Sequence, residues 1–190
     1  MPEKTAAAAP ELTVSVKQFG RQPGTSKQLS IEFAAPADLA TGVVGVGAGS
    51  PAHLDLLLEA VLEGILATGT VRARAAGECA RCLAVLDLPV VATFQELFVY
   101  PEREAAARQA GQPAADEQPA VVQDRLDLNP QVRDAVVLAL PFTPLCRDDC
   151  PGLCPQCGAD LADEPGHAHR AVDARWAVLE DLLEDEREEM

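Results

Sequence analysis

Apolar and polar residues alternate in several stretches of the first half of the chain, and a period of two is typical of half-buried β-strands. The alternation begins near Leu12 and returns near Leu29. Consecutive strands joined by Gly-, Pro- and Ser-containing turns predict an antiparallel sheet over residues 11–100, either curled or closed into a partial barrel. Further alternating runs lie at residues 71–75 and 85–100. Residues 54–62 fit either a helix or a strand, and we expect a strand because Gly64 and Gly69 argue against a long helix.

The run at residues 85–100 changes phase near its end, where Leu97, Phe98 and Val99 follow one another. An extra residue in one strand of a pair produces such a shift, because it turns the following side chains to the opposite face. The pattern therefore predicts a β-bulge in this strand.

The second half of the chain has a different pattern. Residues 101–124 contain few large apolar residues and are expected to be a linker or a disordered insertion, as residues 1–10 are expected to be a disordered lead-in. A helix is predicted to begin with Asn129 as N-cap and Pro130 at its first position, and to end at Pro141.

A second amphipathic pattern over residues 172–183 predicts a C-terminal helix with an acidic end. Residues 125–190 thus combine a helix, a cysteine-rich loop and a C-terminal acidic helix. Together with the sheet, they predict an α+β fold.

The formal net charge is −15, and it is concentrated in the second half of the chain. Such a surface repels phosphate, so broad binding to bare nucleic acid is disfavoured, whereas a basic protein partner, or RNA met through a small basic patch, fits better. Arg72, Arg74 and Arg81 are the candidates for that patch. The sequence offers no secretory leader and no apolar stretch long enough for a membrane span, so we expect a cytoplasmic protein that does not bind membranes.

Six cysteines in a reducing compartment are more typical of metal sites than of disulfides. Two form Cys79-Ala-Arg-Cys82, and four lie in a segment broken by Pro and Gly residues, which can be neither a core helix nor a paired strand. A Cys-x-x-Cys turn presents two thiolates at the spacing of a tetrahedral zinc site. With two histidines, the eight candidate ligands suffice for two such sites: Cys79, Cys82, Cys146 and Cys150 in one, and Cys154, Cys157, His167 and His169 in the other.

Other arrangements of these cysteines remain open from the sequence. The four cysteines of residues 146–157 satisfy a single metal ion equally well, which would leave Cys79 and Cys82 as a redox-active dithiol with Arg81 between them. An iron–sulfur cluster is a further alternative, although the chain lacks the alternating strands and helices of a barrel enzyme.

Zinc, as one or two ions with four protein ligands each, is expected to be structural, since no ligand position stays open for catalysis. The chain shows no catalytic Ser/His/Asp arrangement and no phosphate loop, so we expect no enzymatic activity and no small-molecule substrate.

The cysteine motifs, in this order, resemble those of the YceD family, described as large ribosomal RNA subunit accumulation proteins. The resemblance rests on Cys79-Ala-Arg-Cys82-Leu83 before a long strand, on Cys146-x3-Cys150-Pro-Gly-Leu-Cys154-Pro-Gln-Cys157-Gly158 after a helix, and on Asp173-Ala-Arg-Trp-Ala-Val-Leu179. Family members often have Cys-x-Cys where this chain has His167-Ala-His169. The resemblance implies a cytoplasmic role in the accumulation or maturation of large-subunit ribosomal RNA, with precursor RNA or a basic ribosomal protein as partner.

Overall fold

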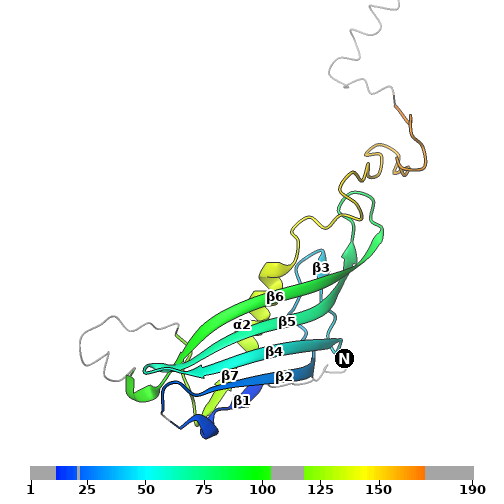
Figure 1. Cartoon of the computed structure of the whole chain (residues 1–190). Coiled ribbons are helices and arrows are strands. Elements are labelled where there is room, and N and C mark those ends of the chain that lie inside the picture. The colour runs from blue at the N-terminus through cyan, green and yellow to red at the C-terminus, as the bar shows by residue number, and fades with distance from the viewer. Residues whose placement is uncertain (1–11, 21, 104–117, 170–190) are drawn as a thin grey trace, which may run out of the picture.

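The computed structural model describes residues 12–20, 22–103 and 118–169, and its elements are labelled in Figure 1. Most of them are antiparallel strands, as the alternating pattern predicts. The elements are β1 (Thr13–Ser15), a 3₁₀ turn (Lys17–Phe19), β2 (Ser26–Ala34), β3 (Val44–Gly45), β4 (Pro51–Ala60), β5 (Gly64–Glu78), β6 (Val85–Val99), β7 (Arg125–Asp127) and α2 (Asn129–Ala139).

The main sheet has five strands, with β2, β4, β5 and β6 side by side in that order. The short strand β3 pairs with β5 near Gly77, beyond the part of β5 that pairs with β4. In the described part of the chain β2 and β6 do not pair with each other, so the sheet is open and not closed into a barrel. A separate pair, β1 with β7, lies below the main sheet in the view of Figure 1.

The predicted bulge in β6 is absent. β5 and β6 pair without interruption from Gly64 opposite Val99 to Glu78 opposite Val85. Phe98 is buried in the same alternation as Val90 and Ala92, so the run of three apolar residues reflects one buried and two half-buried side chains and not a change of face. The 15-residue strands therefore form one continuous hairpin that carries its loop far from the centre of the sheet.

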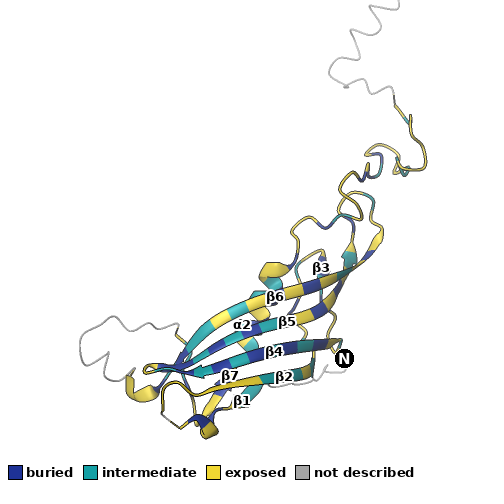
Figure 2. Cartoon of the chain, viewed as in Figure 1, coloured by how far each residue is buried: buried dark blue, intermediate teal, exposed yellow. Residues whose placement is uncertain are grey.

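Helix α2 packs against β6 and presents Val132 and Val136 to the core. Leu128, not Asn129, occupies the N-cap position, and no side chain caps the helix, while Asp127 accepts a hydrogen bond from the Asn129 backbone N–H at 3.0 Å. The helix ends at Ala139, since the residue before Pro141 is pushed into an extended conformation. Figure 2 shows the buried residues along the strands that α2 covers.

Some predicted segments fall outside the described residues: all of 1–10, most of the expected linker (104–117) and the C-terminal helix at 172–183. The described end of the linker, residues 118–124, packs against the sheet. Val121 is buried and donates a backbone hydrogen bond to Val99 at 2.9 Å. Residues 118–124 are therefore part of the fold, although the expected linker included them.

Candidate metal centres

The eight predicted ligands lie in two groups of four. In each group the candidate ligand atoms are all within 4.8 Å of one another. We call the first group the clasp cluster (Cys79, Cys82, Cys146 and Cys150) and the second the local cluster (Cys154, Cys157, His167 and His169). The grouping is the two-site partition that the spacing suggested, and it leaves no isolated Cys79–Cys82 dithiol. Each group could hold one metal ion.

The clasp cluster joins two segments that are far apart in sequence. Cys79 lies at the end of the β5–β6 hairpin, with its Sγ 3.9 Å from that of Cys150, and the Sγ atoms of Cys82 and Cys146 are 3.6 Å apart. The hairpin loop and the segment after α2 run side by side (Figure 1). Cys79 and Cys150 are buried, and they form a small apolar core with Leu86, separate from the main one.

Backbone contacts hold these two segments together independently of the sulfur atoms. The Ala80 N–H donates to the Pro144 carbonyl at 2.8 Å, and the Leu153 N–H donates to the Arg81 carbonyl at 3.0 Å. Gly152 has a φ of +81°, and a Cβ added there would lie 3.0 Å from the Arg81 carbonyl oxygen. The close approach of these two segments of the chain therefore requires glycine at position 152.

Arg81 takes part in this contact with its side chain as well. Its Nη1 donates a hydrogen bond of 2.8 Å to the backbone carbonyl of Cys150. The guanidinium bridges one half of the clasp cluster to the other, so this arginine, expected from sequence to contact RNA, has a positioning role in the structure. No pattern in the sequence indicates that role, since the carbonyl that Arg81 binds lies 69 residues away in the chain.

The two Cys-x-x-Cys turns have the same backbone geometry. In each, the residue after the second cysteine donates its N–H to the carbonyl of the first cysteine, and the first cysteine donates its N–H to the carbonyl five residues on. The residue after the second cysteine has positive φ in both, +76° at Gly158 and +61° at Leu83. The hydrogen bonds are Leu83 N–H to Cys79 O (2.9 Å), Cys79 N–H to Ala84 O (2.8 Å), Gly158 N–H to Cys154 O (2.8 Å) and Cys154 N–H to Ala159 O (2.8 Å).

This turn geometry directs backbone N–H groups at the first sulfur of each pair. The N–H groups of Cys82 and Arg81 lower the pKa of Cys79 to about 6, against the effect of burial, and those of Cys157 and Gln156 do the same for Cys154. Both sulfurs are therefore prepared as thiolates, the form that binds metal. The neighbouring sulfurs, Cys150 first, raise the pKa of Cys146 to about 12, because adjacent negative charges repel until a cation joins them.

The local cluster is built within one short segment and is more exposed. The Nε2 atoms of His167 and His169 each lie 3.2 Å from the Cys157 sulfur, and 2.8 Å from each other. Glu164 lies 2.8 Å from Nδ1 of His167, so this carboxylate can accept the Nδ1 proton and leave Nε2 free to bind a metal. Cys154 and Glu164 raise the pKa of His167.

The donor sets suit a cation that accepts sulfur and imidazole ligands in a tetrahedron. The clasp cluster supplies four sulfurs, and the local cluster two sulfurs and two imidazole nitrogens; both are combinations that bind zinc in structural sites. The sequence missed Glu164 and Arg81 as supporting residues. A carboxylate three residues before a candidate histidine ligand was the available signal for Glu164.

Comparison with known proteins places both clusters inside a described family. The family model for "Large ribosomal RNA subunit accumulation protein YceD" matches residues 67–183, which include all eight candidate ligands. The chain belongs to the YceD family. Similar curated proteins include uncharacterized proteins of Mycobacterium bovis and Mycobacterium tuberculosis, each 44% identical over 92% of this chain and 83% of the relative. An uncharacterized protein of Mycobacterium leprae is 39% identical over 88% of this chain and 76% of its own length. No solved structure is a significant match.

In this YceD family member the other two candidate RNA-binding arginines are engaged by acids. Arg72 forms an ion pair with Asp55, and Nε of Arg74 donates to Asp87 at 2.8 Å. Both lie on the face of the sheet that is open to solvent, while Arg81 lies in the hairpin loop. The three side chains thus have separate partners within the fold.

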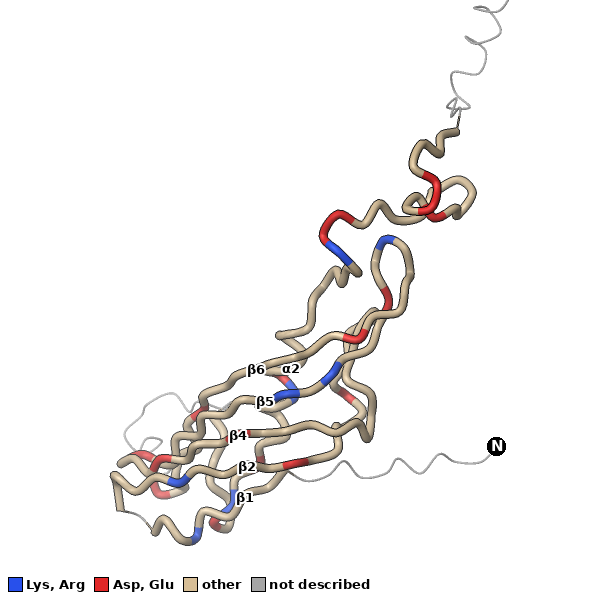
Figure 3. Tube along the Cα trace, turned by 45° about the vertical axis from the view of Figure 1, so that its right-hand side comes forward, with Lys and Arg blue, Asp and Glu red and all other residues tan. Residues whose placement is uncertain are grey.

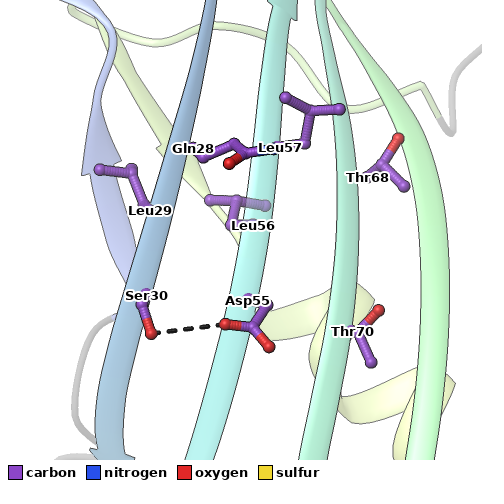
Figure 4. A pocket seen from close by; sticks show the side chains of 8 residues that line it. All are labelled: Gln28, Leu29, Ser30, Asp55, Leu56, Leu57, Thr68 and Thr70. Carbon is purple, nitrogen blue, oxygen red and sulfur yellow. Dashed lines mark hydrogen bonds between the residues drawn. The ribbon is translucent and has the colours of Figure 1, made fainter.

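The open face of the sheet also carries a polar network that the sequence did not reveal. His53 lies with Nδ1 2.6 Å from Glu32 and Nε2 2.9 Å from Asp55, and Ser30 approaches the same Nε2 at 3.1 Å. A shallow hollow of about 440 Å³ adjoins it, lined by Gln28, Leu29, Ser30, Asp55, Leu56, Leu57, Thr68 and Thr70 (Figure 4). Asp55 accepts a hydrogen bond from the Ser30 hydroxyl at 3.4 Å, so the polar groups of the network have partners within the fold.

The described residues of this chain form no helix with the length and apolar character that crossing a membrane requires.

Proposed function

We propose that the protein is a non-enzymatic factor of the cytoplasm that supports the accumulation or maturation of large-subunit ribosomal RNA. The observation that carries this proposal is the family match over residues 67–183, which contains the hairpin end, α2 and both cysteine clusters. The molecule acts as a binding scaffold in this proposal, and no step of it requires a substrate or an open metal position.

Each cluster holds one zinc ion in a structural role. In the clasp cluster the ion joins the long β5–β6 hairpin to the segment after α2, and so fixes the surface that the two segments form together. Four protein ligands fill a tetrahedral site, which leaves no position for water or substrate. Elemental analysis of the purified protein tests this assignment, with two zinc ions per chain as the expected result.

The partner is a basic ribosomal protein, with direct binding to precursor RNA as the second candidate. The formal charge of −15 opposes contact with phosphate and favours contact with lysine and arginine. Figure 3 shows acidic positions along the loop after α2 and along the segment of the local cluster. Arg72 and Arg74 form ion pairs with Asp55 and Asp87, so the net positive charge at these positions that could attract RNA phosphates is low.

Depletion of the protein in its own host tests the function. Large-subunit ribosomal RNA should fall relative to small-subunit RNA, and immature large-subunit particles should appear in a sucrose-gradient profile. The protein should sediment with those particles and leave them as salt is raised, since screening weakens contacts between opposite charges. Normal amounts of both RNAs after depletion, together with no co-sedimentation, would refute the proposal.

A further inference from the structure

The hairpin loop contains an apolar side chain at a backbone position that disfavours it. Leu83 has a φ of +61°, whereas the equivalent position of the second Cys-x-x-Cys turn is occupied by Gly158. A left-handed conformation costs a residue with a Cβ about 1–2 kcal/mol. Glycine would make the same two turn hydrogen bonds without that cost, so the turn geometry does not explain the leucine.

Packing does not explain it either. Leu83 is 59% exposed, and Val85, two residues later, is 84% exposed. Val43 is 50% exposed and precedes Val44, which pairs with Gly77 at the same end of β5. These three residues, which we call the hairpin-end patch, place apolar side chains in water at the end of the molecule that the clasp cluster fixes.

The charges around the hairpin-end patch are predominantly negative. Glu78 pairs directly with Val85 in the sheet, and Asp148 and Asp149 lie in the exposed loop between Cys146 and Cys150. A divalent ion held by four thiolates adds a net charge of about −2. Two nearby cations offset part of this charge: Arg147 pairs with Asp149, with Nε 3.3 Å from the carboxylate, and Arg81 stays charged while it donates to the Cys150 carbonyl. The surroundings of the patch are therefore net negative through Glu78, Asp148 and the charge of the metal-bound thiolates.

We propose that the hairpin-end patch is the docking surface for a basic protein, with Leu83 as the apolar anchor that enters a pocket on that partner. The proposal rests on the proposed function and narrows it to one surface and to a protein partner. An apolar anchor inside an acidic rim fits a pocket bordered by lysine and arginine, and the same rim repels the phosphates of RNA. The conformational cost at Leu83 is then offset by binding and not by folding.

Two substitutions separate binding from folding at this position. Leu83→Gly relieves the strained φ, and Leu83→Asn keeps a side chain that tolerates it. Both should retain two zinc ions and leave the thermal midpoint unchanged or raised by about 2–4 °C. Leu62→Asn is the matched control, because Leu62 is 61% exposed and lies between β4 and β5, at the opposite end of the hairpin.

The binding test uses two probes in separate arms: proteins extracted from purified large ribosomal subunits, and protein-free large-subunit ribosomal RNA. The wild-type chain and Leu62→Asn should bind the protein fraction equally, and both Leu83 variants should bind it about 10- to 100-fold more weakly, the loss expected for one buried leucine. The inference is overturned if all variants bind the protein fraction equally, or if the chain binds only the ribosomal RNA. It is also overturned if the purified protein forms an oligomer and the Leu83 variants do not, because Leu83 would then contact a second copy of the chain. So would a fall in zinc content or thermal midpoint in Leu83→Gly, because Leu83 would then be a structural residue.

Complementation distinguishes this inference from the proposed function. In depleted cells the wild-type chain and Leu62→Asn should restore large-subunit RNA, and Leu83→Gly should not, at equal protein levels. Full rescue by Leu83→Gly overturns the inference and leaves the proposed function intact. If depletion itself leaves the RNA unchanged, the proposed function fails, and the protein-binding arm still decides whether the hairpin-end patch is a docking surface.

Discussion

The clasp cluster and the local cluster use the same Cys-x-x-Cys turn for different purposes. In the clasp cluster the turn lies at the end of a 15-residue hairpin, and its partner sulfurs come from a segment 64 to 71 residues away. In the local cluster the partner ligands follow within 10 to 12 residues. One cluster therefore joins distant parts of the fold, and the other organises its own segment.

Their surroundings differ in the same sense. Two of the four clasp cysteines are buried against Leu86, and backbone hydrogen bonds join the two segments on either side of them. In the local cluster only Cys154 is buried, and a surface carboxylate, Glu164, orients His167. The position of a ligand set in the topology, more than the ligand types, decides how much of the molecule depends on it.

Removal of one ligand from each cluster tests this difference most strongly. Cys150→Ser should abolish zinc binding in the clasp and release a cross-link that closes a loop of 71 residues, which is worth about 4 kcal/mol by loop-closure entropy. Cys157→Ser should remove the other zinc and leave the sheet unchanged. Hydrogen exchange at the hairpin end and at residues 144–153, measured with the zinc content of each variant, reports the result. Similar loss of protection in the two variants would show that the clusters are equivalent.

A second pair of substitutions compares the backbone of the two clusters with the ligands intact. Gly152→Ala forces a Cβ into a φ of +81° and to 3.0 Å from the Arg81 carbonyl oxygen, whereas Gly158→Ala meets a φ of +76° with nothing within 4 Å. Gly158→Ala should lower the free energy of unfolding by about 1–2 kcal/mol through backbone strain. Gly152→Ala should lower it by about 1 kcal/mol more, because the hairpin loop and the segment after α2 must also move apart. Denaturant unfolding of both variants measures the difference. A larger loss in Gly158→Ala would contradict the tight contact at Gly152.

A third substitution probes the support of the local cluster. Glu164→Gln removes the carboxylate that accepts from Nδ1 of His167, and the affinity of that cluster for zinc should fall about tenfold. Asp163→Asn changes the charge equally one residue away and should have little effect. Competition with a chromophoric chelator gives the two affinities, and only the affinity of the local cluster should change. A parallel loss in Asp163→Asn would reduce the effect to general electrostatics.

The sequence revealed local features of this comparison and concealed the long-range ones. The period-two pattern located the strands, and the spacing of thiols and imidazoles gave the ligand groups, because both signals lie within a few residues. The phase of residues 97–99 was misread as a bulge, since three adjacent apolar residues do not show which one faces the core. The sequence does not show the hydrogen bond from Arg81 to the Cys150 carbonyl, because the two residues become neighbours only when the hairpin folds against the segment after α2. The RNA contact predicted for Arg81 stays a prediction.

The predicted N-cap at Asn129 failed for a related reason. A favourable residue type occurs one position beyond the cap, and Leu128 takes the cap position because its side chain is fully buried. Tertiary packing thus overrides capping preference there. The polar network around His53 was hidden as well, since its members come from two strands, β2 and β4, whose register the sequence does not specify.

That network provides the smallest expected effect and an internal reference for the clusters. Hydrogen bonds to Asp55, and then to Glu32, raise the pKa of His53 above its ordinary value of 6.5. A raised pKa in the folded state means that protonated His53 stabilises the sheet fully below pH 6.5, and that this contribution is lost as the pH rises through the raised value. His53→Gln should remove a small decrease in stability that sets in as the pH rises above 6.5. Because the network lies on the sheet and outside both clusters, NMR titration of the His53 ring should give the same raised pKa in wild type, Cys150→Ser and Cys157→Ser. A His53 pKa that returns to 6.5 in Cys150→Ser alone would mean that the clasp controls the whole sheet and not only its end.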